Sequence, residues 1–154
     1  LMPLKHPKTW FVIADGARAR ILRNDGPGTA LVPAIDRDLS DPAVHGHSRD
    51  LKSDKPGRAF DTGSGQHHAM EPHHDFHNFE KRMFARQVAK LLDEHAGKHA
   101  IERLVIVAPP KTLGDLRAEL SSHTSALVAA EVAKDLTHVP VTQILDHLRD
   151  VPQF

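Results

Sequence analysis

The chain has 154 residues, of which 40% are hydrophobic and 26% charged, and this composition is typical of one globular domain. It contains no cysteine, which excludes disulfides, disulfide-linked partners, thiolate metal sites and cysteine nucleophiles. Twenty Lys and Arg balance twenty Asp and Glu, which disfavours a broad electrostatic surface for nucleic acid or anionic membrane but allows a local basic patch.

No part of the sequence has the pattern of a targeting or membrane segment. Residues 1–8 lack the apolar run of a secretory signal. The longest apolar runs, 10–14 and 104–108, are far shorter than the roughly 20 residues that a membrane helix needs. We therefore expect a cytoplasmic protein without membrane insertion, in which one domain, 10–150, lies between tails at 1–9 and 151–154.

The first part of the chain predicts three strands. Residues 10–14 are a continuous apolar run, typical of a strand that is buried on both faces and lies at the centre of a sheet. Asp15 and Gly16 then predict a hairpin into an antiparallel strand over residues 17–22. After a turn rich in Gly, Asn and Asp, residues 30–35 have the composition of a third strand.

Residues 40–74 contain few apolar side chains and many Pro, Gly, His and charged residues, so we interpret them as a long loop. A connection of this length without secondary structure is uncommon inside a compact domain and is usually functional or disordered. This segment is therefore the first place in which to look for a site, and an unstructured insertion is the alternative.

A helix is predicted after this loop. Apolar residues recur at helical spacing from Phe76 to Leu92, with Asp75 placed as the N-cap and Gly97 just past the end. Its Phe and Met side chains are more typical of a core-facing stripe than of a cofactor site.

The last part of the chain predicts strands that alternate with helices. Residues 101–108 have the pattern of a second fully buried strand, and Thr112 with Asp115 predicts a capping box for a short helix. Alternation at 126–133 favours a strand, and residues 141–148 predict an amphipathic helix. The expected fold class is therefore α/β: a single domain with a mixed sheet, in the order β-β-β-α-β-α-β-α, and covering helices.

Thirteen histidines are the outlier of the composition, and several of them cluster in the loop and at the start of the helix. Imidazole is a common ligand of zinc, copper and nickel, which suggests a divalent metal and a metal-dependent hydrolase. The spacing matches no known motif, so solvated loop histidines and adventitious metal capture are the alternatives, and no other cofactor is implied. The candidate metal ligands are His67, His68, His73, His74 and His77.

A turn within residues 53–61 places Arg58 between Asp54 and Asp61. A guanidinium group suits the bidentate recognition of phosphate or carboxylate, and an internal Asp–Arg pair that orders the loop is the alternative. The sequence has no nucleophile elbow, Walker loop or dinucleotide-binding motif, so it favours a binding role over a catalytic one.

Seven motifs, spread over most of the chain, together resemble those of the bacterial host-attachment protein family. They are Ala14–Arg20, Asp36–Leu39, Ser53–Asp61, Phe84–Arg86, Val107–Pro110, Leu113–Arg117 and Lys134–His138. The resemblance implies a role in bacterial attachment to host cells, and the lack of an export signal favours an indirect role. It implies no catalytic mechanism. The binding candidates that lie in the motifs are Asp15, Arg18, Arg20, Asp54, Arg58, Asp61, Arg86, Lys134 and Asp135.

The family in turn is similar to the middle domain of archaeal and eukaryotic peptide-release factors, which carries Gly-Gly-Gln in a mobile loop before its long helix. The corresponding stretch here is Gly63-Ser64-Gly65-Gln66, in which Ser64 departs from the pattern. The similarity implies Gln66 as a further site residue and ribosome or RNA binding, of a rescue or dormancy type, as an alternative function. That function requires a shared basic face made of Arg18, Arg20, Arg58 and Arg86.

Overall fold

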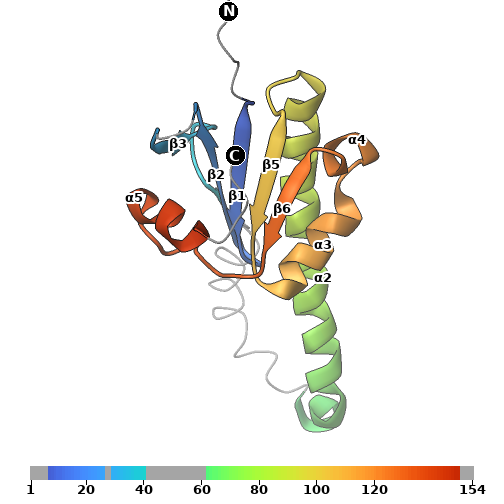
Figure 1. Cartoon of the computed structure of the whole chain (residues 1–154). Coiled ribbons are helices and arrows are strands. Elements are labelled where there is room, and N and C mark those ends of the chain that lie inside the picture. Colours follow the sequence, from blue (N-terminus) through green and yellow to red (C-terminus); the bar gives the residue numbers. More distant parts are fainter. Residues whose placement is uncertain (1–6, 27–28, 41–61, 150–154) are drawn as a thin grey trace, which may run out of the picture.

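The computed structural model describes the backbone of residues 7–26, 29–40 and 62–149 and, within these ranges, all side chains except those of 62–75. One mixed sheet has the strand order β3-β2-β1-β5-β6, with the short β4 paired to β2 (Figure 1). The strands are β1 (Thr9–Ala14), β2 (Arg18–Asn24), β3 (Leu31–Pro33), β4 (Leu39–Ser40), β5 (Arg103–Val107) and β6 (Val128–Val132). The helices are α2 (Thr62–Gly97), α3 (Pro110–Glu119), α4 (Ser122–Ser125), α5 (Val141–Ile144) and the 3-10 helix η2 (Leu145–Leu148).

Strand β1 lies at the centre of the sheet, as its continuous apolar run predicts. It pairs antiparallel with β2, where Val12 is opposite Ile21, and parallel with β5, where Val12 is opposite Ile106. The predicted Asp15–Gly16 hairpin connects β1 to β2. Strand β6 adds parallel to β5, so the predicted strand in 126–133 is also confirmed.

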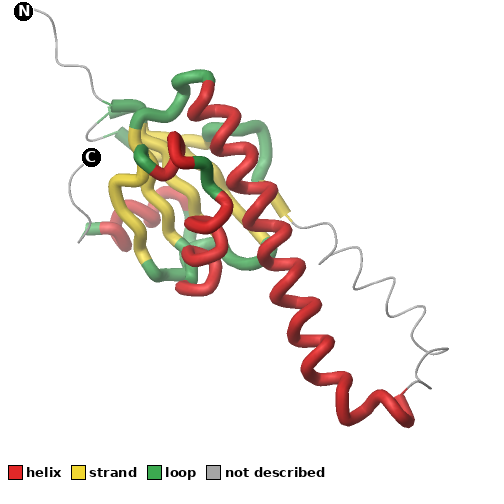
Figure 2. Tube along the Cα trace, turned by 90° about the vertical axis from the view of Figure 1, so that its right-hand side faces the viewer, coloured by secondary structure: helices red, strands yellow, loops and turns green. Residues whose placement is uncertain are grey.

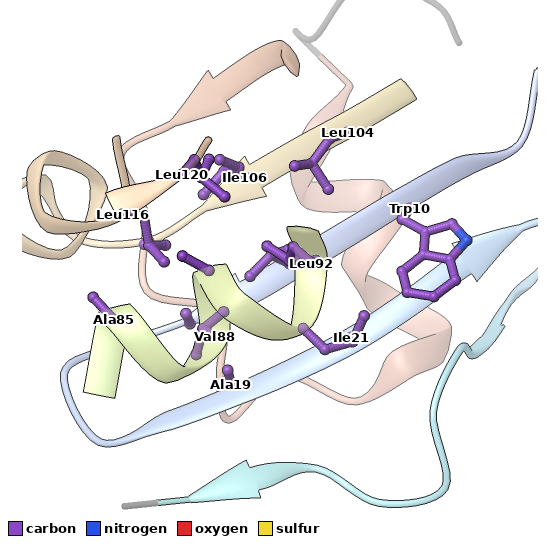
Figure 3. Packing of buried hydrophobic residues seen from close by; sticks show 14 of the residues in the cluster. Trp10, Ala19, Ile21, Ala85, Val88, Leu92, Leu104, Ile106, Leu116 and Leu120 are labelled. Carbon is purple, nitrogen blue, oxygen red and sulfur yellow. The ribbon is translucent and has the colours of Figure 1, made fainter. Parts of the chain in front are cut away.

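Alternate side chains of β1 enter two different apolar layers, and this makes the domain a three-layer structure. Trp10 and Val12 belong to the layer that α2 and α3 cover, and Figure 3 shows Val88 and Leu92 of α2 pointing toward the sheet in this layer. Phe11 and Ile13 face the opposite layer, which the C-terminal segment closes with Leu136, Ile144 and Leu148. A single α/β domain with a mixed sheet and covering helices is therefore confirmed.

Helix α2 is longer than the sequence predicts. We expected a loop at 40–74 and a helix that starts at Asp75, but the helix starts at Thr62 and continues through Pro72. The prediction was wrong because the glycines, Pro72 and histidines of this stretch have low helix propensity, and the structure keeps them helical despite it. Residues 41–61 lie outside the described part of the chain.

The two parts of α2 have different surroundings. From Phe84 to Ala96 its inward face is buried in the core, whereas Phe76 and Phe79 are 43% and 50% exposed. Figure 2 shows that the N-terminal part projects well beyond the sheet. Among the described side chains of α2, those that enter the hydrophobic core therefore belong to its C-terminal part.

Several helix ends also differ from the predictions. Helix α3 starts at Pro110, so Thr112 is a buried residue inside the helix and not its cap, and Asp115 pairs with Lys111. Proline is favoured at the first position of a helix because its missing N–H has no partner there in any case. At the end of α2 the residue with positive φ is His99 (62°) and not Gly97. The predicted element order also lacked β4 and α4.

Candidate functional site

The topology of the sheet creates a crevice between two neighbouring strands. The parallel strands β1 and β5 end side by side, with Ile13 opposite Val107. From β1 the chain turns toward β2, and from β5 it turns the other way, through α3 toward β6. In open α/β sheets, ligands bind outside the carboxyl ends of the strands at such a switch point. We call the ends of β1, β5 and β6, with the residues that follow them and the residues of α2 that lie against them, the carboxyl edge.

A hollow of about 430 Å³ lies at this switch point, and we call it the switch-point pocket. Three segments that are distant in the sequence line it: residues 15–17 after β1, Pro109, Lys111 and Thr112 at the start of α3, and His77, Glu80 and Lys81 of α2. Its volume lies within the range of about 300–1,000 Å³ that is typical of small-molecule sites.

The Asp15 side chain fixes the turn that forms one wall of this pocket. Its Oδ1 accepts hydrogen bonds from the backbone N–H groups of Ala17 (2.8 Å) and Arg18 (2.7 Å). The hydroxyl of Thr137 lies 3.4 Å from its Oδ2 and links the turn to the segment after β6. Asp15 therefore has a structural role at the carboxyl edge.

Gly16 allows helix α2 to approach this turn closely. A Cβ atom at position 16 would lie 2.8 Å from Cγ and 3.0 Å from Cδ of Lys81, which is closer than carbon atoms normally approach. The aliphatic part of Lys81 thus lies against the Gly16 backbone. This contact places Lys81 at the pocket, where its ammonium group forms no ion pair with any described residue.

Glu80 is the polar residue of the pocket that the protein leaves least satisfied. Its Oε2 is buried and has no hydrogen-bond partner among the described residues. Buried polar atoms in native proteins are nearly always hydrogen-bonded, so such an exception calls for a specific explanation. Because this oxygen is buried, other atoms of Glu80 line the hollow.

The third wall of the pocket is the first turn of α3. The first N–H groups of a helix have no partner within the helix, and they favour anions. Lys111 lies in this turn, and its Nζ is 3.1 Å from the carboxylate of Asp115 one turn later. The Lys111 side chain is 43% exposed, but that of Asp115 is only 12% exposed, so this half-buried pair holds the Lys111 ammonium group against α3.

A second hollow, of about 340 Å³, is lined by Arg18 and Arg20 of β2, by residues 38–40 and by Thr137. The Arg20 Nη1 donates to the backbone oxygens of Val139 (2.5 Å) and Thr137 (3.4 Å), and Asp38 lies 4.0 Å from its Nε. Only 15% of the Arg20 side chain is exposed. This arginine therefore connects β2 to the segment after β6.

Asp135 and Lys134, which follow β6, also make internal contacts. Asp135 Oδ1 accepts from the Thr137 hydroxyl (2.6 Å) and the Thr137 N–H (3.1 Å). These bonds, the one from the hydroxyl most of all, lower the pKa of Asp135 and outweigh the opposing effect of desolvation. The Nζ of Lys134 donates to the backbone oxygen of His147 (2.9 Å).

Comparison with protein families shows which family the chain belongs to. The family model described as "Protein required for attachment to host cells" matches residues 10–148. The chain belongs to this family. It is also 39% identical over 69 residues to the uncharacterized protein RP470 of Rickettsia prowazekii (strain Madrid E), a match that covers 44% of this chain. The matched stretch is 46% of RP470, so the match spans about half the length of that relative.

Membership of the host-attachment family confirms the resemblance that the motifs indicated, and it leaves the similarity to release factors as a prediction. In the structure, Gly63–Gln66 lies within α2 and not in a loop before the helix, so the expected loop position of Gln66 was wrong. Over the described residues, no helix has the length and apolar character needed to cross a membrane.

The structure brings together the predicted site residues that follow the parallel strands and separates the others from them. Asp15, Arg18 and Arg20 meet the segment of Lys134 and Asp135 at the carboxyl edge, through the contacts described above. Arg86 lies on α2 with Glu119, 3.8 Å away. Asp54, Arg58 and Asp61 lie outside the described residues.

The predicted basic face stays a prediction, because Arg58 lies outside the described residues. Arg20 donates to backbone oxygens, which counts against its part in such a face, whereas Arg86 is largely exposed and lies 3.8 Å from Glu119. The predicted metal site remains untested. Its residues His67, His68, His73 and His74 are in α2, but their side chains lie outside the described set, and His77 lines the switch-point pocket. Among the described side chains, no group of three or more His, Asp or Glu is placed to hold a metal ion.

Four polar residues that line the pocket were not predicted as site residues: Glu80, Lys81, Lys111 and Thr112. A signal existed for the last two, because residues directly after a buried parallel strand lie at the carboxyl edge. No sequence signal identifies Glu80 and Lys81, since their position depends on where α2 crosses the β1–β2 turn.

Proposed function

We propose that this protein contributes to the attachment of bacteria to host cells as a binding protein and not as an enzyme, and that its partner binds at the carboxyl edge. The observation that carries the proposal is the match of the host-attachment family model to residues 10–148. The carboxyl edge is the proposed surface because it holds the switch-point pocket and the motif residues Asp15 and Arg18.

The contacts of Asp15 and Asp135 support a structural role for these two carboxylates over a catalytic one. A general base needs a carboxylate that is free to accept a proton from a substrate. Asp15 and Asp135 instead accept hydrogen bonds from backbone N–H groups and from the Thr137 hydroxyl. Their carboxylates are thereby committed to holding the turns of the carboxyl edge.

An attachment assay in a bacterium that carries this gene tests the proposal. We expect deletion to lower the number of bacteria bound per host cell and the parent gene to restore it. Genes with Arg18→Ala or Lys81→Gln should restore it only in part, because both side chains are exposed at the carboxyl edge. Lys90→Gln, an exposed position farther along α2, is the matched control. Full attachment after deletion would contradict the proposed role.

We further propose that the role in attachment is indirect and that the protein acts inside the cell. Fractionation of cells that express a tagged protein, together with labelling of surface proteins, tests this location. We expect the tag in the cytoplasmic fraction, and a surface-labelled protein would show instead that it contacts the host directly.

A further inference from the structure

Helix α2 carries an apolar stripe that is separate from the face it buries in the core. Phe76, Phe79 and Met83 follow one another at spacings of three and four residues, which places them on one face of the helix. Both phenylalanines are exposed, at 43% and 50%, and Met83 is half-buried. We propose that this stripe packs against the same stripe of a second copy of the chain, which gives an antiparallel dimer through α2.

The stripe lies on the side of α2 opposite to the buried face. At 3.6 residues per turn, Met83 lies about half a turn from the middle of the face that is buried between Phe84 and Ala96. Phe76 and Phe79 lie within about 40° of Met83 around the helix axis. Figure 2 shows that this part of α2 projects beyond the sheet. The stripe therefore takes no part in the packing of α2 against the sheet.

The N-terminal part of α2 has a composition that calls for tertiary support. Gly63, Gly65 and Pro72 lie inside the helix, and both residue types disfavour a helix interior. Most helical stability in proteins comes from the packing of an amphipathic face and not from propensity. A second copy along the stripe would supply such packing beside this part of the helix.

Charged positions beside the stripe favour a second copy in the antiparallel orientation. Asp75 directly precedes Phe76, and Arg82 directly precedes Met83, so these two positions flank the same edge of the stripe. The guanidinium carbon of Arg82 lies 5.8 Å from the centre of the Phe79 ring, and Arg82 forms no ion pair with a described residue. In an antiparallel pair this edge meets the same edge of the second helix, so Asp75 of each copy is level with Arg82 of the other.

A parallel pair lacks this complementarity. It would bring the edge with Asp75 and Arg82 against the other edge of the stripe, which carries Glu80 and Gln87. Asp75 would then lie opposite Glu80, and Arg82 opposite Gln87. An antiparallel pair about a two-fold axis instead forms two equal Asp–Arg contacts, as a self-complementary interface does.

The area of the stripe sets the expected strength of the dimer. A phenylalanine contributes about 150–250 Å² of surface, and about half of it is exposed at both positions, so the four rings of a dimer bury on the order of 400 Å². Stable interfaces bury about 1,200–2,000 Å² in total. We therefore expect a weak dimer, which dissociates when the protein is diluted.

Sedimentation equilibrium of the purified full chain tests the proposal. We expect the mean mass to rise from that of a monomer toward that of a dimer between about 10 and about 500 µM, and the helix content measured by circular dichroism to rise with it. Phe79→Gln should shift association to a concentration at least about tenfold higher, and glutamine preserves the helix because its helix propensity is not lower than that of phenylalanine.

Lys98→Gln, at an exposed position after the end of α2, is the control and should associate as the parent does. A parent that stays monomeric up to about 500 µM would overturn the proposal and leave the stripe to a different protein. Association that is equal in the parent and in Phe79→Gln would also overturn it, because the dimer would then form elsewhere.

Charge reversal tests the antiparallel orientation. Arg82→Glu and Asp75→Lys each place like charges at both contacts, so each should weaken association about threefold or more. The double variant should associate as the parent does, and an equal mixture of the two single variants should associate more tightly than either alone. Stronger association of Asp75→Lys alone would indicate a parallel pair. That result, or a double variant as weak as the single ones, would overturn the proposed pairing.

Discussion

At the scale of single residues, the carboxyl edge contains two kinds of polar side chain. Asp15, Arg20 and Asp135 have their hydrogen-bonding atoms directed at the backbone or at Thr137. Glu80 and Lys81 line a pocket; among the described residues, Oε2 of Glu80 has no hydrogen-bond partner and Lys81 has no ion pair. Substitutions in the first group should therefore change the stability of the protein, and substitutions in the second group should change its binding.

Asp15→Ala tests the structural role of the β1–β2 turn. The substitution leaves the N–H groups of Ala17 and Arg18 without their acceptor, so we expect a loss of about 1–2 kcal/mol in the free energy of unfolding. Asp25→Ala removes an exposed carboxylate that pairs only with Arg23 in the described structure, and it should cost less than about 0.5 kcal/mol. Urea denaturation of both variants measures the difference, and equal losses would contradict the role of Asp15.

Thr137 should control the titration of Asp135. The hydroxyl and N–H of Thr137 lower the pKa of Asp135 below its ordinary value of 3.8. These bonds therefore stabilise the fold fully above that value, and the contribution is lost as the pH falls through the lower pKa of the folded state. We expect Thr137→Val to raise the pKa of Asp135 toward its ordinary value and Thr137→Ser to keep it low.

Carboxyl carbon NMR shifts of Asp135, followed from pH 6 to about pH 2, measure this pKa in the three proteins. The serine variant is the control for the loss of the methyl group, because it retains the hydroxyl. An unchanged pKa in Thr137→Val would show that the hydroxyl does not hold the charge of Asp135.

At the scale of elements, helix α2 divides into an embedded part and a projecting part. Phe84 is 2% exposed in the core, whereas Phe79 is 50% exposed and has Arg82 above its ring. We expect Phe84→Ala to lower the free energy of unfolding by about 3–5 kcal/mol. Phe79→Ala should lower it by less than about 1 kcal/mol. Similar losses from chemical denaturation of the two variants would mean that the projecting part is also packed.

The sequence predicts the sheet better than it predicts this helix. The apolar run of 10–14, the Asp15–Gly16 hairpin and the alternation of 126–133 are local patterns, and all three elements form as expected. The start of α2 is not a local property, because the stretch from Thr62 contains Gly and Pro72 and is still helical. Composition therefore predicted a loop where the structure has a helix.

The difference between local and non-local properties also explains which residues of the candidate site the sequence could indicate. Asp15, Arg18 and Arg20 lie within one turn and the strand after it, so a sequence motif could identify them. The pocket instead depends on the contact of Lys81 with Gly16, between segments more than sixty residues apart. Hydrophobic periodicity predicts the inward face of α2, but it does not predict which exposed residues overlie the β1–β2 turn.

At the scale of the whole molecule, the charge distribution bears on the choice between host attachment and ribosome binding. Proteins that bind RNA mainly through phosphates present a basic surface and bind in a salt-dependent manner. This chain has equal numbers of acidic and basic residues. Arg20 and Arg86, two of the four arginines assigned to a basic face, contact Val139 and Glu119.

We therefore expect no co-sedimentation of the purified chain with ribosomes at salt concentrations from about 50 to 200 mM, the range in which phosphate contacts weaken most visibly. Arg58→Ala and Gln66→Ala are measured beside the parent, because both residues were predicted to contact the ribosome or RNA. The structure does not describe either side chain, so it does not test that prediction. Salt-sensitive binding by the parent that decreases in either variant would contradict this expectation. It would place the protein in translation and make its effect on attachment a downstream consequence. The absence of binding in all three proteins would leave the carboxyl edge as the surface at which to search for the partner.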